Sequence, residues 1–245
     1  MYYLKKDNER FAQRKYESLF LHASGFIPQK EEAPVGVVYN MKICIWITKI
    51  FDLGGTKRVV SLLANELVKE HEVTIMTYED RFREDRTMYH LSEDINVDFI
   101  DNSQFVNKHH TPAFCARYLV KKLNDRSGMF NKKSLNPILA EAIFSQKTRE
   151  KWVEYFNSQD YDVILTTASL SLRLAMIAPR LKAATIGWQH NCYDGYLHVK
   201  PVVFWQQENL LQQYLPNLDR YIVLSDYDKR DYMEKLGIDC EVKIN

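Results

Sequence analysis

The chain has 245 residues, of which 46% are hydrophobic and 27% are charged, and its net charge is +1. This length allows one large or two small domains with a packed core, and the balanced charge gives no argument for nucleic acid as a partner. No uninterrupted apolar stretch is long enough to cross a bilayer, the N-terminus is polar, and the four cysteines are widely separated. We therefore expect a cytoplasmic protein with reduced thiols.

The first forty residues differ in pattern from the rest. Residues 7–21 read as a charged helix, whereas residues 22–40 contain two glycines and two prolines that interrupt regular structure. Two interpretations remain open. Residues 1–40 are either a native helical and irregular extension, or an over-extended reading frame ahead of a natural start at Met41. In both cases we expect the folded domain at residues 41–245.

From Met41 onward, short apolar runs alternate with segments of helical periodicity. The apolar runs predict strands at 42–48, 72–77, 95–100, 161–166, 184–189, 219–224 and 240–244. The periodic segments predict helices at 56–70, 112–126, 136–157, 170–181, 202–214 and 226–236. Strands that alternate with helices indicate right-handed crossovers. We therefore expect a single doubly wound α/β domain with a mostly parallel sheet that helices flank on both faces.

The pair Gly54–Gly55 lies between the first predicted strand and the first predicted helix. Open α/β sheets bind ligands at the carboxyl ends of their strands, and free N–H groups at a helix N-terminus favour a phosphate-bearing ligand. Thr56 is the expected N-cap, and Arg58 in the first turn could reach a phosphate. The alternatives are a tight turn that needs glycine for its backbone and a solvated arginine.

Two further sets of polar residues follow predicted strands. His190 and Asn191 fall where the strand 184–189 should end, so the imidazole could bind a sugar hydroxyl or polarise a reacting group near neutral pH. The alternative is a structural histidine that ties down the loop. Ser225 starts the helix after the strand 219–224, as an N-cap or as a ligand contact. The seven histidines show no ligand spacing with cysteines or carboxylates, so no metal site is predicted.

Residues 105–133 are locally basic and contain interleaved aromatic residues. Cations and aromatic rings on one helix suit an anionic membrane surface, and they identify Arg117, Lys121 and Lys122 as candidate contacts. A solvated helix face is the alternative. Nucleic acid is the other polyanion, but no recognised binding motif supports it.

Three segments, in this order, resemble family-4-type glycosyltransferases of the GT-B architecture. The first is MKICIWITKIFDLGGTKRVVSLLANEL with HEVTIMTY, the second is IGWQHNCYD, and the third is DRYIVLSDYDKRDYMEKLGIDCEVKIN. The similarity covers about 41–245. It implies a Rossmann-like domain, namely the N-terminal half of a GT-B enzyme, which mainly binds the acceptor.

The resemblance also implies a function. It implies transfer of a sugar with retention, usually without metal or cofactor, from a nucleotide sugar to a glycan or lipid-linked acceptor in cell-surface polysaccharide biosynthesis. His190 would contact the transferred sugar or help place the nucleophile. Substrate and donor-phosphate binding would fall to Gly54, Gly55, Thr56, Arg58, Asn191 and Ser225. The basic helix would dock on the inner face of the cell membrane through Arg117, Lys121 and Lys122.

The chain departs from the family at Asn245, where the interdomain linker would begin. Because the donor-binding domain is absent, we expect a truncated gene, a cloned fragment or one half of a split enzyme that is inactive without its partner. A non-catalytic subunit that binds an acceptor or recruits a partner to the membrane is one alternative. A nicotinamide-dependent oxidoreductase with Glu79 or Asp80 as ribose ligand is another, against which the missing third glycine argues.

Overall fold

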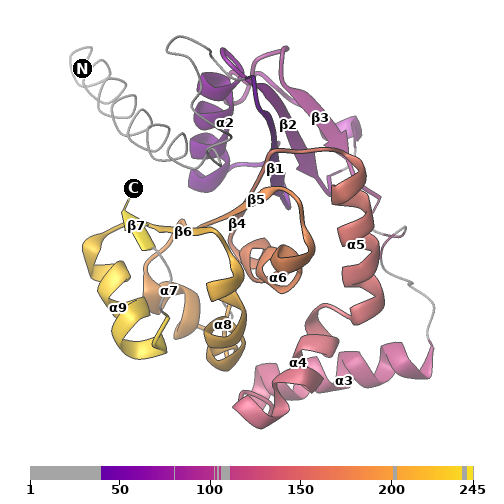
Figure 1. Cartoon of the computed structure of the whole chain (residues 1–245), viewed down its shortest axis with the longest axis vertical. Helices are drawn as coiled ribbons and strands as arrows, with labels where there is room; N and C mark the ends of the chain where they lie inside the picture. Colours follow the sequence, from indigo (N-terminus) through magenta and orange to yellow (C-terminus); the bar gives the residue numbers. More distant parts are fainter. Residues whose placement is uncertain are drawn as a thin grey trace.

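A seven-stranded parallel sheet forms the centre of the molecule (Figure 1). The computed structural model describes residues 40–79, 81–101, 103, 105, 111–200 and 203–238, and the backbone of 242–244. Its strands run in the order β3-β2-β1-β4-β5-β6-β7. Their bounds are β1 (Lys42–Ile47), β2 (Glu72–Thr77), β3 (Asn96–Phe99), β4 (Val163–Thr167), β5 (Ala184–Trp188), β6 (Arg220–Val223) and β7 (Val242–Ile244).

The strand order reverses between β1 and β4, which are hydrogen-bonded neighbours. In open α/β sheets such a reversal is the topological switch point, beside which ligands bind at the carboxyl ends of the strands. The doubly wound parallel architecture predicted from the sequence is therefore confirmed. The predicted helix at residues 7–21 lies outside the described residues.

Helices cover both faces of the sheet (Figure 1). One face packs on α2, and the other packs on α5, α6, α8 and α9. The described α-helices are α2 (Gly55–Leu67), α3 (Pro112–Ser127), α4 (Asn136–Ile143), α5 (Gln146–Ser158), α6 (Ser169–Ile177), α7 (Tyr193–Leu197), α8 (Glu208–Tyr214) and α9 (Asp226–Leu236).

Strand β1 shows why these strands read as continuous apolar runs. Its side chains alternate between the two faces, so Ile43, Ile45 and Ile47 belong to the core under α2. Cys44 and Trp46 belong to the core on the other face, where the ring of Trp46 lies 4.6 Å from that of Trp152 on α5. Both faces of the strand are buried, so no polar alternation remains in its sequence.

Two helical predictions need correction. The predicted helix 136–157 is two helices, because Phe144 is extended and buries its ring, while Ser145 caps α5 by accepting a hydrogen bond from the Thr148 N–H. The predicted helix 202–214 begins only at Glu208, and α7 forms in a segment expected to be a polar loop. The residue Thr56 is not an N-cap, because α2 already begins at Gly55.

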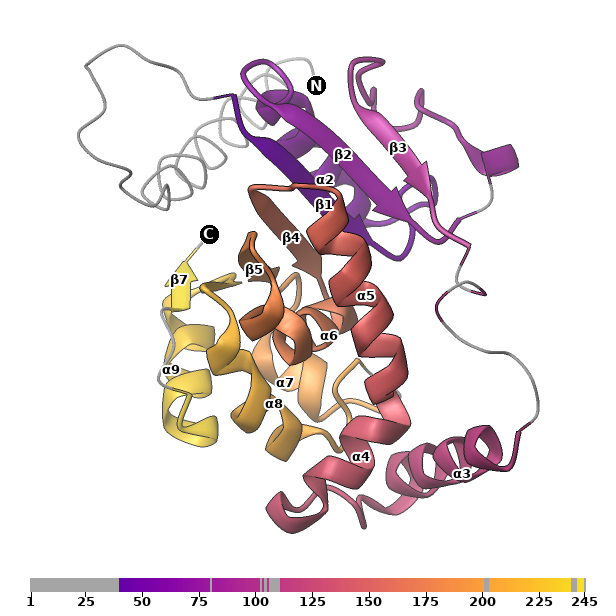
Figure 2. The same cartoon turned by 45° about the vertical axis from the view of Figure 1, so that its right-hand side comes forward.

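The helices α3 and α4 form an arm beyond the carboxyl ends of the strands (Figure 2). Its position follows from the topology, since α5 must run from this side back to the amino end of β4. Asparagine side chains attach the arm to the segment before and within α8. Asn124 is fully buried and donates to the Gln206 carbonyl at 2.7 Å, while Asn136 donates to the Asn209 carbonyl at 2.9 Å.

Candidate functional site

The N-terminus of α2 is open at the switch point. No side chain caps it, and its first turn contains no acidic residue. Its first intrahelical hydrogen bond runs from the Arg58 N–H to the Gly54 carbonyl, so the preceding N–H groups have no acceptor within the helix. Lys57 and Arg58 add positive charge to the positive end of the helix dipole. This combination favours an anion.

The two glycines differ in their surroundings. A Cβ at Gly54 would meet the side chain of Lys57 at 3.0 Å. A Cβ at Gly55 would meet nothing within 4 Å, and Gly55 is exposed. The packing of the described residues therefore does not require glycine at position 55, and the open space beside it admits a ligand to the backbone.

Two residues that sequence reasoning missed as site residues hold this loop in place. The Glu79 carboxylate, just after β2, accepts hydrogen bonds from the N–H groups of Ile50 at 2.5 Å and Phe51 at 2.9 Å. The Tyr89 hydroxyl accepts a hydrogen bond from the Gly54 N–H at 2.8 Å. Glu79 was considered above as a ribose ligand, but its carboxylate faces the loop after β1. Both residues contact a loop that is distant from them in sequence, so no local sequence pattern indicates these contacts.

His190 follows β5, which lies two strands from β1 in the sheet. Neighbouring strands are about 4.8 Å apart, so these two strands are separated by about 10 Å. The imidazole packs on Trp188, with ring centroids 4.2 Å apart, and the His190 N–H donates to the Tyr196 hydroxyl at 3.3 Å. Nε2 of His190 is buried and has no hydrogen-bond partner among the residues that the structure describes.

Burial sets the protonation state of His190. Desolvation lowers its pKa from 6.5 to about 4, so the imidazole is neutral at pH 7. A neutral imidazole has one donor and one acceptor nitrogen and can therefore bind a hydroxyl group in either sense. The unpartnered Nε2 is the kind of buried polar atom that calls for an explanation, and a ligand hydroxyl would supply a partner.

The buried side chain of Gln189 holds the turn that contains His190. Gln189 is fully buried, and its side-chain amide nitrogen donates to the Asn191 backbone carbonyl at 2.5 Å, while its side-chain oxygen Oε1 accepts from the Tyr221 hydroxyl at 3.3 Å. Asn191 is exposed, and its side-chain oxygen accepts a hydrogen bond from the Cys192 N–H at 2.9 Å. A Cβ at Gly195 would come within 2.8 Å of the Asn191 amide, so a larger residue there would displace the Asn191 side chain.

Ser225 caps α9, as the sequence predicted. Its hydroxyl accepts from the Asp228 N–H at 3.2 Å and donates to the Asp228 carboxylate at 2.7 Å. The same carboxylate accepts from the Tyr193 N–H at 2.8 Å, which joins the ends of β5 and β6. Because its hydroxyl is engaged in this way, Ser225 could contact a ligand only if these bonds rearranged.

A residue with a strained backbone follows β4, the strand that lies between β1 and β5 in the sheet. Ala168, directly after β4, has φ 51°, a value that residues with a Cβ seldom adopt. Such strain persists only where the surrounding structure enforces it, and it is common at functional sites. The carboxyl ends of β1, β4 and β5 thus bring together the loops of Gly54, Ala168 and His190. In the described ranges, no three His, Cys, Asp or Glu side chains come together in a way that could hold a metal ion.

The candidate membrane residues lie on α3, away from these loops (Figure 2). Arg117 pairs with Glu141 at 3.7 Å and Lys121 pairs with Asp125 at 2.7 Å, whereas the ammonium of Lys122 lies 5.9 Å from the Tyr118 ring centroid. Exposed apolar side chains accompany them on the arm, namely Tyr118, Leu119, Leu123, Met129 and Ile138. Among the described helices, none has both the length and the apolar composition that crossing a bilayer requires.

The sequence profile of Glycosyltransferase Family 4 matches residues 53–244. A sucrose-phosphate synthase from Thermosynechococcus elongatus has a similar structure, with a TM-score of 0.51 and 14% identity over 83% of this chain and 47% of that one. A lipopolysaccharide outer core galactosyltransferase, WaaB, matches with a TM-score of 0.47 and 14% identity, over 83% of this chain and 45% of that one. The chain thus spans about half the length of these structures. No curated protein matches its sequence.

Proposed function

Because the chain belongs to glycosyltransferase family 4, we propose that it is the acceptor-binding half of an enzyme that transfers a sugar from a nucleotide sugar. The observation that carries the proposal is the open, glycine-lined N-terminus of α2 at the switch point, in a chain of this family. A second half would bind the nucleotide and close over the strand ends.

The site residues have distinct roles in this proposal. The free N–H groups of Gly55 and Thr56, with Arg58 beside them, stabilise the negative charge that develops on the leaving diphosphate. The neutral His190 hydrogen-bonds a hydroxyl of the transferred sugar or helps to place the acceptor hydroxyl that attacks it. Asn191 and Ser225 complete the wall formed by the ends of β5 and β6. No step requires a cofactor beyond the nucleotide-sugar substrate.

The acceptor in this proposal is a glycan or lipid-linked precursor of a cell-surface polysaccharide, reached from the membrane surface. The exposed apolar residues of α3 and α4 and the basic residues Arg117, Lys121 and Lys122 support docking of the arm on anionic lipid. Lys122 is the strongest candidate contact, because the carboxylates of Glu141 and Asp125 already offset the charges of Arg117 and Lys121.

A non-catalytic subunit is the second candidate function. It is favoured by the exposed apolar and basic side chains of the arm, which would serve recruitment to a membrane. Such a subunit would bind an acceptor or recruit a partner to the membrane without chemistry of its own. A nucleotide-sugar turnover assay with and without a donor-binding half separates the two functions, because only the enzyme half produces turnover with its partner.

A further inference from the structure

Arg173 on α6 is a charged side chain to which the proposed chemistry gives no role. It is half-buried, its guanidinium carbon lies 5.8 Å from the ring centroid of Phe144, and its positive charge acts on the nearby hydroxyl of Tyr78. In the described part of the chain it forms no ion pair with a carboxylate. A guanidinium carries five N–H donors and a permanent charge, so this half-buried side chain still has donors and charge to offer a ligand in place of water.

Tyr78 does not supply the missing negative charge. Burial raises the pKa of its hydroxyl to about 12, so the phenol is neutral at pH 7. Its oxygen already accepts a hydrogen bond from Nε1 of Trp46 at 3.0 Å. Arg173 therefore has the Phe144 ring and the neutral Tyr78 hydroxyl as neighbours, and neither of them offsets its charge.

Arg173 lies close to the ligand-binding edge of the sheet. It is the fifth residue of α6, which begins at the end of β4, so it is about 6 Å along the helix from that edge. Tyr78 follows β2, and its N–H donates to the Thr48 carbonyl at 3.3 Å, at the start of the glycine loop. The guanidinium thus lies near the segment that also contacts the start of the loop at Gly54.

We propose that Arg173 binds an oxyanion of the acceptor, either a phosphate ester or a carboxylate. This inference rests on the proposed function, because it assigns a chemical class to the acceptor. The planar fork of N–H donors suits both oxyanions, which it binds through two parallel hydrogen bonds. The bound anion would compensate the charge that Tyr78 and Phe144 leave unmatched.

The test is an anion titration of the chain followed by tryptophan fluorescence, since Trp46 contacts Tyr78 directly. One titration uses inorganic phosphate and the other uses acetate, both at millimolar concentration with sodium chloride holding the ionic strength constant. We expect saturable binding in at least one titration, and the anion that saturates identifies the ligand group as a phosphate or a carboxylate. Absence of saturable binding in both titrations overturns the proposal.

Matched variants assign the binding to this residue. We expect Arg173→Gln to weaken binding at least tenfold and Arg173→Lys, which keeps the charge but loses the fork, to weaken it less. Arg180→Gln, at an exposed arginine just after α6, should bind as the unmodified chain does. Circular dichroism of each variant confirms the fold, and Arg173→Lys carries the test if Arg173→Gln does not fold. Binding that falls in Arg58→Gln but persists in both Arg173 variants belongs to α2 and overturns the proposal.

The outcome is separable from that of the proposed function. If the Arg173 variants bind anions normally while sugar transfer still depends on His190, only the role of Arg173 is wrong. If anion binding depends on Arg173 while no transfer occurs with any donor-binding half, the anion site stands and the enzymatic function falls.

Discussion

The hydroxyl of Tyr89 lies 2.8 Å from the backbone nitrogen of Gly54, although 35 residues separate the two in the chain. Glu79 holds the same loop through the N–H groups of Ile50 and Phe51. The connection between β2 and β3 therefore fixes the conformation of the loop after β1. A loop held in this way presents the N-terminus of α2 without ordering it anew for each ligand.

Glu79→Ala should lower the stability of the chain more than Glu79→Gln does. Alanine leaves two backbone N–H groups without their acceptor, which costs about 1–3 kcal/mol for each group that stays buried. Glutamine retains one acceptor oxygen and should cost less, because both N–H groups donate to a single oxygen of Glu79, Oε2. Urea unfolding followed by circular dichroism measures both free energies of unfolding. Equal stability of the two variants would show that the carboxylate does not hold the loop.

Alanine at two glycines near the site should have opposite consequences. Gly187→Ala in β5 should destabilise the fold, because its Cβ would lie 2.8 Å from Cδ2 of the buried Tyr221 ring and 3.1 Å from the Cβ of buried Ser171. Gly55→Ala should leave stability unchanged or raise it by up to about 1 kcal/mol, since nothing lies within 4 Å and alanine favours the helix. In the enzyme reconstituted with a donor-binding half, Gly55→Ala should nonetheless lower turnover more than tenfold. Unchanged turnover would remove the loop from the site.

The stability of the chain should fall between pH 6.5 and pH 4 because of His190. The folded state holds the pKa of this imidazole near 4, whereas its ordinary value is 6.5, so the unfolded chain takes up a proton first as the pH falls. Between those values the contribution amounts to about 3 kcal/mol, and below pH 4 it no longer changes. His190→Gln should remove this part of the pH dependence. Parallel urea titrations from pH 7 to pH 4 for both proteins measure it, and identical slopes would contradict the burial of a neutral imidazole.

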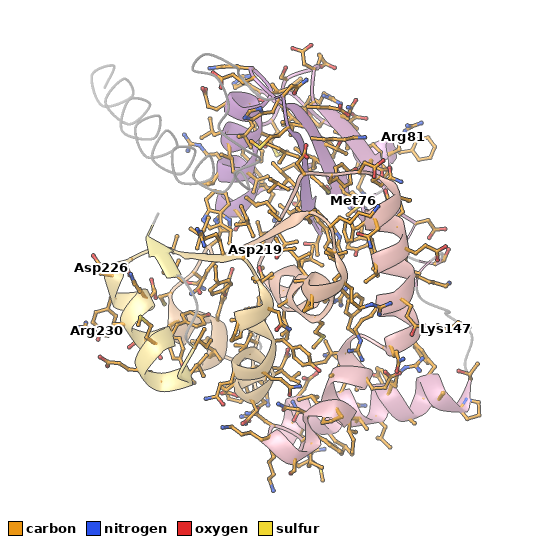
Figure 3. All side chains as sticks on the ribbon, viewed as in Figure 1. Met76, Arg81, Lys147, Asp219, Asp226 and Arg230 are labelled. Carbon is orange, nitrogen blue, oxygen red and sulfur yellow. The ribbon has the colours of Figure 1, made fainter. Side chains whose placement is uncertain are left out.

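The arm should bind anionic vesicles through its apolar and basic side chains. We expect the chain to sediment with vesicles that contain phosphatidylserine, and Lys122→Glu together with Leu119→Asp to lower the bound fraction at least fivefold. Neutral phosphatidylcholine vesicles should bind weakly, and added salt should release the chain. Arg230→Glu on α9, whose side chain points outward in Figure 3, is the control. Equal loss in that variant would indicate nonspecific attraction of charge.

The sequence predicted the sheet well because both of its faces are buried, which leaves apolar runs such as that of β1. It also placed Gly54 and His190 at strand ends, and Ser225 as a cap, since these depend on local order along the chain. The break at Phe144 was missed because a buried ring, rather than glycine or proline, interrupts the helical pattern there. The loop contacts of Glu79 and the position of Arg173 against Phe144 were missed because their partners are distant in sequence.

The central claim is that this chain contributes the sugar- and acceptor-facing wall of a two-part glycosyltransferase. Its most direct test is turnover of a labelled nucleotide sugar by the chain, alone and with a separately supplied donor-binding half, for the natural sequence and for His190→Ala. We expect turnover only when both halves are present, and a loss of well over tenfold in His190→Ala with the fold retained by circular dichroism. Turnover that is the same without the second half, or unaffected by His190→Ala, would contradict the account.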